Sequence, residues 1–183
     1  NTGWFLMNLK ERGSLKCVGI DKKNPHADFD KQRAILRIFS GIDGIDFRNG
    51  HWSPYDNHSI IGLEESEQFD ITVCTSFLEH ISDPLNLINE LSKRTRKALL
   101  LSAHIRDRLR VFNYGMNITY RPMSHHVKWG DTFPYGFDTT VSKKLLFYSL
   151  KQCGFNEIIE VKYKKNWLPF RWCSRYCTVV CLK

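Results

Sequence analysis

Residues 69–91, FDITVCTSFLEHISDPLNLINEL, decide the fold class because a strand pattern passes directly into a helix pattern. The first part, residues 69–75, is a short apolar run typical of a buried strand, and it ends in small polar residues. The second part begins at Asp83 and Pro84, which are typical of the N-cap and the first turn of a helix. In open α/β sheets, ligands bind beyond the carboxyl ends of the strands. The residues that join the two parts are therefore expected to border a binding cleft.

The joining segment carries two side chains suited to acid–base chemistry. An imidazole exchanges its proton near neutral pH, so His80 is a candidate general base. Glu79 is a candidate to orient a neighbouring base through a hydrogen bond. The structural alternative is that the two residues only cap the turn before the helix.

Helix-like and strand-like patterns alternate along the rest of the chain, which predicts an α/β domain with a mainly parallel sheet. The predicted helices are residues 4–12, 30–39, 84–93 and 142–153. The predicted strands are residues 15–20, 45–48, 69–75, 98–102, 157–163 and 176–182. Residues 104–136 have no clean period and are rich in aromatic, His and Arg side chains. They predict a long connection of the kind that forms lids and substrate-binding loops.

The composition fits one soluble domain. A chain of 183 residues is long enough for one domain with a sizeable core, and 42% hydrophobic with 25% charged residues argues against disorder. No run approaches the roughly 20 apolar residues of a membrane-spanning helix, and the amino end lacks a signal-peptide pattern. No membrane partner is therefore predicted, and a cytoplasmic location is expected. The net charge of +8 favours phosphates or acidic molecules without naming one.

The six cysteines are scattered, and several lie in apolar stretches where a free thiol acts as a small buried hydrophobe. Cys173, Cys177 and Cys181 recur every four residues. However, residues 176–182 have a strand pattern, on which these side chains would not easily converge on a metal ion. The cysteines are therefore interpreted as reduced and structural.

Two further groups have the pattern of a nucleotide site. Asp21 ends the first predicted strand, 18 residues after Gly3 (21 − 3). In nucleotide-binding units such a glycine allows close approach of the ligand, and such an acid binds ribose hydroxyls. The alternative is chance spacing and an ordinary turn residue. After the next predicted strand, Gly50, His51 and Trp52 offer either a wall for an adenine ring or a turn with a core tryptophan.

These segments resemble the class I S-adenosylmethionine-dependent methyltransferases of the broad small-molecule group, over essentially the whole chain. NTGWFLMNLKERG is similar to the end of the family's glycine loop and the helix after it, and CVGID to the second strand with its ribose-binding acid. FDITVCTSFLEHISDPLNLINEL is the strongest match, with Phe-Asp, Leu-Glu-His and Asp-Pro in the family's order. VSKKLLFYSLKQCGFNEIIEV resembles the late helix and the strand that follows, and YCTVVCLK resembles the final strand.

The resemblance implies a Rossmann-like, mainly parallel seven-stranded sheet with one antiparallel edge strand and helices on both faces. It implies a single domain over residues 1–183, with a substrate insertion at about 104–136, and S-adenosylmethionine as cofactor. Because the chain starts inside the glycine loop, the first strand of the family is expected to be absent. The residues implied to bind the cofactor are Asn1, Gly3, Asp21, Gly50, His51, Thr75 and Ser76.

The implied reaction transfers the activated methyl group to an oxygen or nitrogen atom of a small-molecule acceptor, such as a metabolite or a sugar-like compound. Since the cofactor already carries the leaving group, positioning and proton removal supply most of the catalysis. Glu79 and His80 are the expected catalytic residues. The expected substrate-binding residues are His104, Tyr114, His125, His126 and Trp129, and the alternative for each is ordinary packing.

Three alternatives stand beside this interpretation. In quinone-biosynthesis and small-RNA methyltransferases a further Glu joins Leu-Glu-His in a metal site, whereas Thr75 and Ser76 occupy the candidate positions here. No metal is therefore predicted, and a divalent ion held by Glu79, His80 and a later histidine is the alternative. The charge of +8 and the segment KYKKNWLPFRW favour a nucleic-acid acceptor, but the Asn/Asp-Pro-Pro-Tyr and Pro-Cys motifs of nucleic-acid methyltransferases are absent. The third alternative is a methyltransferase-like module without catalysis.

Overall fold

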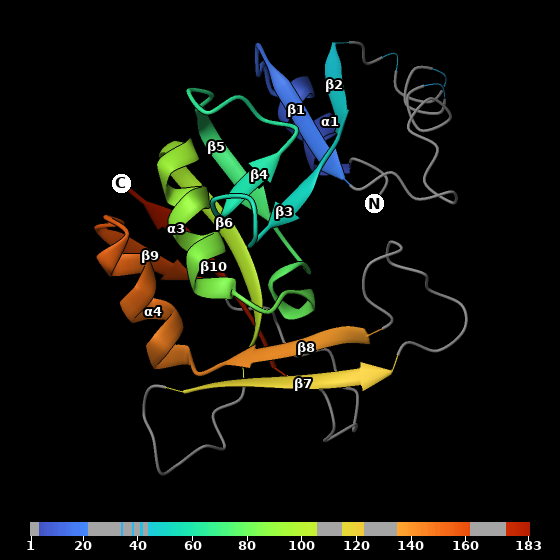
Figure 1. The fold of residues 1–183 in the computed structure, drawn as a ribbon. Helices are drawn as coiled ribbons and strands as arrows, with labels where there is room; N and C mark the ends of the chain where they lie inside the picture. Colours follow the sequence, from blue (N-terminus) through green and yellow to red (C-terminus); the bar gives the residue numbers. More distant parts are fainter. Residues whose placement is uncertain are drawn as a thin grey trace, which may run out of the picture. The chain divides into compact units, whose positions relative to one another are not determined.

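The computed structural model describes residues 4–21, 34, 38, 41, 44–105, 115–122, 135–161 and 175–183 (Figure 1). The chain forms two compact units, Asn1–Glu65 and Ser66–Lys183. In the described residues, no helix is both long enough and apolar enough to cross a bilayer.

The first unit opens with helix α1 (Trp4–Glu11), which packs on the parallel strand pair β1 (Cys17–Asp21) and β2 (Ile45–Asn49). The helix ends at Glu11, and Gly13 after it has a φ of 93°, the left-handed conformation of a glycine helix cap. The amide of Ser14 closes this cap by donating to the carbonyl of Leu9 over 3.1 Å. Of the helix predicted at 30–39, the structure describes Ala34 and Ile38, and both are helical.

A small hairpin that the sequence did not predict completes the first unit. Strands β3 (His51–Ser53) and β4 (Ser59–Ile61) pair antiparallel, and the chain reverses through Asn57 and His58, which have φ values of 53° and 50°. The Ser53 hydroxyl accepts a hydrogen bond from the amide of Asp56 over 3.1 Å. These turn contacts are local, but the strands are only three residues long, too short to leave a clear alternating pattern.

The second unit contains a six-stranded sheet in the order β7-β8-β6-β10-β9, with β5 paired to β6. Its strands are β5 (Phe69–Cys74), β6 (Thr95–Ile105), β7 (Met116–Pro122), β8 (Tyr135–Val141), β9 (Glu157–Glu160) and β10 (Arg175–Leu182). The β5–β6 and β6–β8 pairs are parallel, whereas β7–β8, β6–β10 and β9–β10 are antiparallel. In the described residues the sheet is therefore mixed, which corrects the prediction of seven mainly parallel strands with one antiparallel edge strand.

The main source of this difference is the segment predicted as an irregular connection at 104–136. Strand β6 continues to Ile105, and β7 and β8 pair with each other over seven residues each. The sequence 117–120, Asn-Ile-Thr-Tyr, contains the β-branched and aromatic residues that favour strands. Their pairing partner lies about 20 residues further along the chain, so the local pattern gave no sign of it.

Helices α3 (Pro84–Arg94) and α4 (Lys143–Gln152) contact each other on one face of this sheet (Figure 1). In the strand register, Leu99 lies opposite Cys181 and Leu101 opposite Val179, so these side chains share that face. All four are completely buried. The buried helix residues that accompany them are Leu87, Ile88, Leu91, Leu146 and Leu150. This layer is the hydrophobic core of the second unit.

Both helices begin with a side-chain cap, and the cap of α3 is the predicted one. The Asp83 carboxylate accepts a hydrogen bond from the amide of Asn86 over 3.3 Å, and Pro84 follows in the first turn. The Ser142 hydroxyl accepts one from the amide of Leu145 over 3.2 Å. The signal at residues 83–84 was therefore correctly interpreted, whereas Ser142, predicted as the first helical residue, is the cap before α4.

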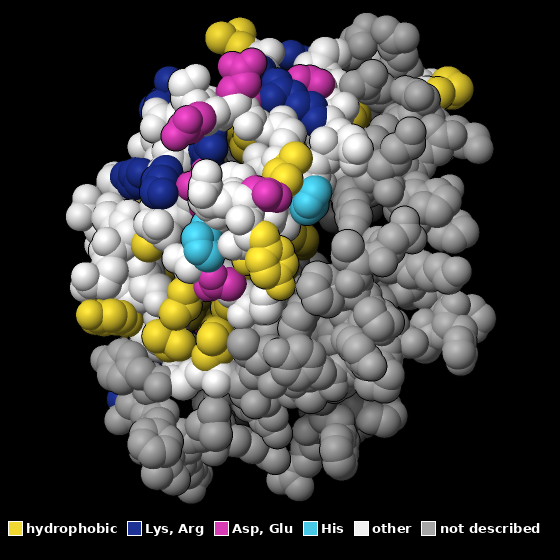
Figure 2. All heavy atoms as spheres, viewed as in Figure 1, with side chains coloured by type: hydrophobic (Ala, Val, Ile, Leu, Met, Phe, Trp, Pro, Cys, Tyr) yellow, Lys and Arg dark blue, Asp and Glu magenta, His cyan; other side chains and the backbone are white. Residues whose placement is uncertain are grey.

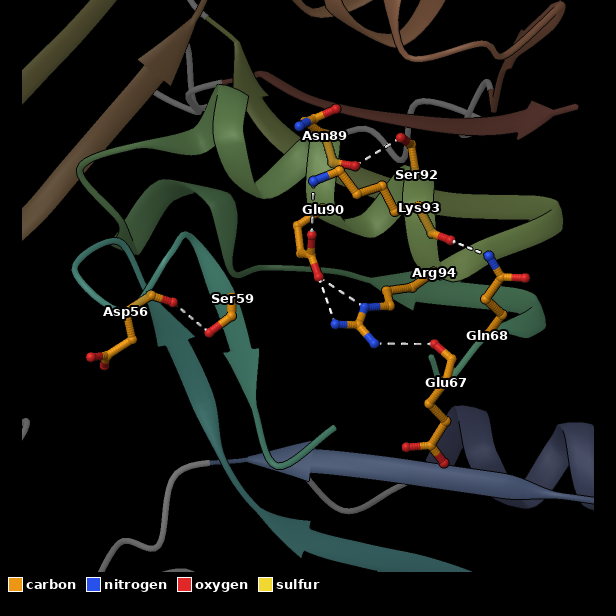
Figure 3. A network of polar contacts seen from close by, with 9 residues as sticks. All are labelled: Asp56, Ser59, Glu67, Gln68, Asn89, Glu90, Ser92, Lys93 and Arg94. Carbon is orange, nitrogen blue, oxygen red and sulfur yellow. Dashed lines mark hydrogen bonds and ion pairs between the residues drawn. The ribbon is translucent and has the colours of Figure 1, made fainter. Parts of the chain in front are cut away.

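A buried ion pair secures the end of α3 (Figure 3). Arg94 donates to the Glu90 carboxylate over 2.8 Å, and their side chains are only 6% and 8% exposed. Arg94 also donates to the carbonyl of Glu67 over 3.3 Å, and the side chain of Gln68 donates to the carbonyl of Lys93 over 2.9 Å. The segment that leads into β5 is thus fastened to the last turn of α3.

Candidate functional site

The carboxyl end of β5 is fixed by a hydrogen bond from the neighbouring strand. Ser76 has a φ of 53°, a left-handed conformation that costs a non-glycine residue roughly 1–2 kcal/mol. Its amide donates to the hydroxyl oxygen of Ser102 on β6 over 3.0 Å. Ser102 is only 5% exposed, whereas Ser76 lies at the surface, so the bond fastens an exposed residue to a buried side chain. The predicted residues Thr75 and Ser76 therefore lie at a strand end with a defined, non-extended backbone.

The chain then turns through the short 3₁₀ helix η1 (Leu78–His80), which contains both predicted catalytic residues. Their side chains have different environments. Glu79 is 3% exposed, whereas His80 is exposed. Burial, with a smaller contribution from the negative charge of Glu79, raises the pKa of the Cys74 thiol to about 12. The Glu79 carboxylate is therefore close to the end of β5 and inside the protein, while the imidazole of His80 lies at the surface.

A second hydroxyl fastens the other end of this turn. Thr139 on β8 donates from its side chain to the carbonyl of Ile81 over 2.5 Å, and Thr139 is buried. We call residues 76–81 the motif loop. Its first residue is bonded to β6 and its last to β8, and the Asp83 cap of α3 follows two residues later. Both ends of the motif loop are thus held by side chains from other strands.

The first unit brings two of the predicted cofactor residues together. The amide of Gly50 donates to the carbonyl of Asp21 over 3.0 Å, which extends the β1–β2 ladder by one bond. A Cβ at position 50 would lie 2.0 Å from the carbonyl oxygen of Ile61, so only glycine fits there. This corrects the predicted glycine turn, because the chain passes from β2 into β3 through Gly50, and glycine is needed for close packing.

The two residues after Gly50 have different environments. His51 is exposed at the start of β3, whereas Trp52 is buried, with its ring centroid 6.1 Å from that of His58. The burial of Trp52 favours the alternative of a core tryptophan over a wall for an adenine ring. Its indole Nε1 has no hydrogen-bond partner within the part of the chain that the structure describes.

Among the predicted substrate residues, the structure describes His104. It lies in β6 opposite Tyr176 of β10, and it shares a sheet face with Ser102, two residues earlier. This corrects its predicted place in an irregular connection, since β6 continues through it. The predicted residues outside the described part of the chain are Asn1, Gly3, Tyr114, His125, His126 and Trp129.

Sequence reasoning missed Ser102 and Thr139. Ser102 ends the apolar run 98–102, and this small polar residue at a predicted strand end was the only available signal. Thr139 is 58 residues from its bonding partner, and nothing near it in the sequence marks it. Hydrogen bonds between distant segments depend on the sheet pairing, which the sequence did not provide.

Metals and charge add little to the site. In the described ranges, no group of three His, Cys, Asp or Glu side chains is placed to hold a metal ion. The described cysteines Cys17, Cys74, Cys153, Cys177 and Cys181 are free thiols. On the described surface visible in Figure 2, Lys and Arg side chains lie among Asp and Glu side chains. Such a mixed surface gives the net charge of +8 no single focus in this view.

No protein-family profile matches the sequence, and no curated protein is significantly similar to it. Solved structures do match. The N-terminal domain of EvdMO1 with bound SAH has a TM-score of 0.64 at 15% identity, over 95% of this chain and 66% of that one. Magnesium protoporphyrin IX methyltransferase (ChlM) from Synechocystis PCC 6803 with bound SAH has a TM-score of 0.61 at 14% identity, over 100% of this chain and 70% of that one.

An S-adenosylmethionine-dependent methyltransferase from Mesorhizobium loti has a TM-score of 0.60 at 12% identity, over 100% of this chain and 87% of that one. The present chain thus spans about two thirds of the length of the EvdMO1 domain and most of the Mesorhizobium loti protein. At these identities the likeness concerns the fold. The chain has the fold of the class I S-adenosylmethionine-dependent methyltransferases.

Proposed function

We propose that this protein is an S-adenosylmethionine-dependent methyltransferase that methylates an oxygen or nitrogen atom of a small-molecule acceptor. The observation that carries the proposal is the match over 95–100% of the chain to methyltransferase-fold structures, two of which hold SAH. We further propose that residues 1–183 act as one methyltransferase domain, with the segment at about 104–136 binding the acceptor.

In the first unit, the residues fit the ribose end of such a cofactor. Asp21 lies at the carboxyl end of a parallel strand, where a carboxylate can accept two hydrogen bonds from a vicinal diol. The amide of Gly50 bonds to the carbonyl of Asp21 and so fixes the backbone beside this carboxylate. We assign cofactor binding to Asp21, Gly50 and His51 in this unit, and to Asn1 and Gly3 at its start.

In the second unit, Thr75 and Ser76 are the proposed cofactor contacts. They follow β5 at the strand end where ligands bind in α/β sheets. The left-handed Ser76 redirects the chain at this point, and its own amide is already used by Ser102. This leaves the side chains and carbonyls of the two residues as the groups available to a ligand.

The cofactor, when bound, supplies the activated methyl group, and the protein has to position the acceptor and remove its proton. We assign proton removal to His80, because its exposed imidazole can reach an acceptor without crossing the core. Buried Glu79 is assigned the role of fixing the η1 turn that carries His80. His104 is the proposed acceptor contact within the described chain.

The proposed acceptor class draws on the names of two related structures. One related structure was determined in the presence of SAH and D-fucose, and another is a magnesium protoporphyrin IX methyltransferase. Both names mention small molecules. We therefore propose a metabolite or sugar-like acceptor that is methylated on oxygen or nitrogen, with S-adenosylmethionine as methyl donor.

Calorimetric titration of SAH into the protein tests the cofactor assignment. We expect micromolar binding, weakened about tenfold or more in Asp21→Asn, because a charge-assisted hydrogen bond contributes roughly 1.5–3 kcal/mol. Asp46→Asn is the matched control, since Asp46 lies on the adjacent strand and pairs with Arg48 over 2.7 Å. Absence of SAH binding by the folded wild type would refute the proposed function. Equal affinities of the two variants would refute the role of Asp21 alone.

Release of SAH from S-adenosylmethionine, measured with panels of sugars, phenols and amines, tests the acceptor. A productive acceptor should lose most of its turnover in His80→Gln while SAH affinity stays the same, because the variant lacks a base but keeps the fold. Turnover with RNA alone would overturn the small-molecule assignment.

A further inference from the structure

The motif loop connects the proposed cofactor contact Ser76 with the proposed base His80. A shift of the loop would displace both residues from the positions in which they act. Within the loop, the amide of His80 donates to the carbonyl of Phe77 over 2.9 Å. Two further hydrogen bonds join the loop to β6 and β8.

The anchor on β6 acts at the strained residue. A left-handed serine is unfavourable by itself, so Ser76 needs a compensating contact to stay in this conformation. The hydroxyl of Ser102, which is itself buried, supplies it by accepting from the amide of the exposed Ser76 over 3.0 Å. Without this acceptor, the left-handed conformation of Ser76 would lose its compensating hydrogen bond, and we expect the end of β5 to shift toward a more relaxed backbone.

The anchor on β8 acts at the opposite end. The Thr139 hydroxyl donates to the carbonyl of Ile81 over 2.5 Å, and β8 contacts η1 along this part of the chain. The next fixed point is Asp83, the N-cap of α3. The orientation of η1, and with it the direction of the His80 side chain, is therefore set between Thr139 and the helix cap.

We propose that Ser102 and Thr139 are positioning residues of the methyltransferase site, which hold the motif loop in its binding-competent conformation from its two ends. This inference rests on the proposed function, because it assumes that Thr75 and Ser76 bind the cofactor. The two residues touch neither cofactor nor acceptor in this scheme. They act by keeping the competent conformation populated before the ligand arrives, so their loss lowers the apparent affinity by the fraction of competent molecules.

The variants are Ser102→Ala and Thr139→Val, each of which removes one hydroxyl with little change in volume. Ser102→Thr and Thr139→Ser restore a hydroxyl and should rescue. Ser92→Ala is the matched control, because Ser92 is also 5% exposed and its hydroxyl bonds to the carbonyl of Asn89 within α3. Thermal unfolding of each variant establishes that it is folded at the temperature of the assay.

Two measurements are made on every folded variant. Hydrogen–deuterium exchange of the peptide covering the motif loop reports on the loop without any ligand, and we expect about tenfold faster exchange in Ser102→Ala and Thr139→Val than in Ser92→Ala. Calorimetry with SAH reports on the site, and we expect up to about tenfold weaker binding, equivalent to ~1.4 kcal/mol, with recovery in Ser102→Thr.

The outcomes separate the two proposals. Unchanged exchange in both hydroxyl-free variants would refute the holding role, whatever SAH does. Faster exchange with unaltered SAH affinity would refute the positioning role while the proposed function stands. If the wild type fails to bind SAH, the proposed function and the cofactor-positioning role fall together, and the exchange result still decides whether the hydroxyls hold the loop.

Discussion

Replacing Arg94 with methionine should destabilise the protein by about 3 kcal/mol. Removal of one partner from a buried ion pair leaves an uncompensated charge and typically costs about 3–5 kcal/mol. Glu90 would be that charge, with its side chain 8% exposed. Lys93 lies 3.4 Å from the same carboxylate, but it is 63% exposed, so it offsets only part of the loss and places the estimate at the lower end of the range. Urea unfolding followed by circular dichroism measures the change in the free energy of unfolding. In a thermal unfolding experiment, Tm should fall by about 6–12 °C.

The control is Lys93→Met, the same substitution at the neighbouring exposed position, which should cost under about 0.5 kcal/mol. The double variant Glu90→Leu with Arg94→Met removes both buried charges, and its stability should lie within about 1 kcal/mol of the wild type. An Arg94→Met variant as stable as Lys93→Met would refute the reasoning. So would a double variant that is no more stable than Arg94→Met alone, because removal of the second charge would then give no relief.

Three further perturbations follow from the structure. Gly50→Ala should lower the stability of the protein by about 3 kcal/mol or prevent folding, because the added Cβ would lie 2.0 Å from a backbone oxygen of β4. Gly13→Ala meets open space and should cost only about 1–2 kcal/mol of stability for its left-handed φ. Thermal unfolding of both variants compares the two effects. Cys74, with its pKa raised from 9.0 to about 12, should react with iodoacetamide at pH 8 far more slowly than the half-buried Cys153, as mass spectrometry would show. Since the pKa of Cys74 is raised in the folded state, the stability that this thiol contributes is complete below pH 9 and is lost as the pH rises from about 9 toward 12. A midpoint of unfolding that does not change with pH over that range would contradict the raised pKa. Asp83→Ala should cost about 1 kcal/mol through the lost cap, and a cost below that of an exposed α3 substitution such as Asn89→Ala would argue against the capping role.

The sequence predicted best where the cause of the structure is local. The cap at Asp83, with Pro84 after it, depends on residues within one turn, and the structure has it. Strand β6 shows the limit of such reasoning. Only its apolar centre, 98–102, was predicted, while the structure extends the strand over Arg96 and Lys97, which pair with Asp70 over 3.0 and 2.7 Å. A charged pair of residues looks like a strand end until its partner on the next strand is known.

The candidate site divides in the same way. Thr75, Ser76, Glu79 and His80 were proposed because a strand end followed by a helix cap locates the rim of an α/β sheet. Their individual environments were not predictable, since the burial of Glu79 and the exposure of His80 depend on packing of the turn against β6 and β8. The same holds for Trp52, whose burial is set by the unpredicted β3–β4 hairpin.

The position of β10 in the sheet has a consequence for biosynthesis. In the strand order β10 lies between β6 and β9, although it follows both in the chain. When a ribosome has made residues up to 161, β9 has been synthesised but its partner strand β10 has not. The sheet therefore stays incomplete until residues 175–182 have left the exit tunnel. Folding of this unit is therefore expected to finish after synthesis of β10, and a chain terminated before Arg175 would separate β9 from the rest of the sheet.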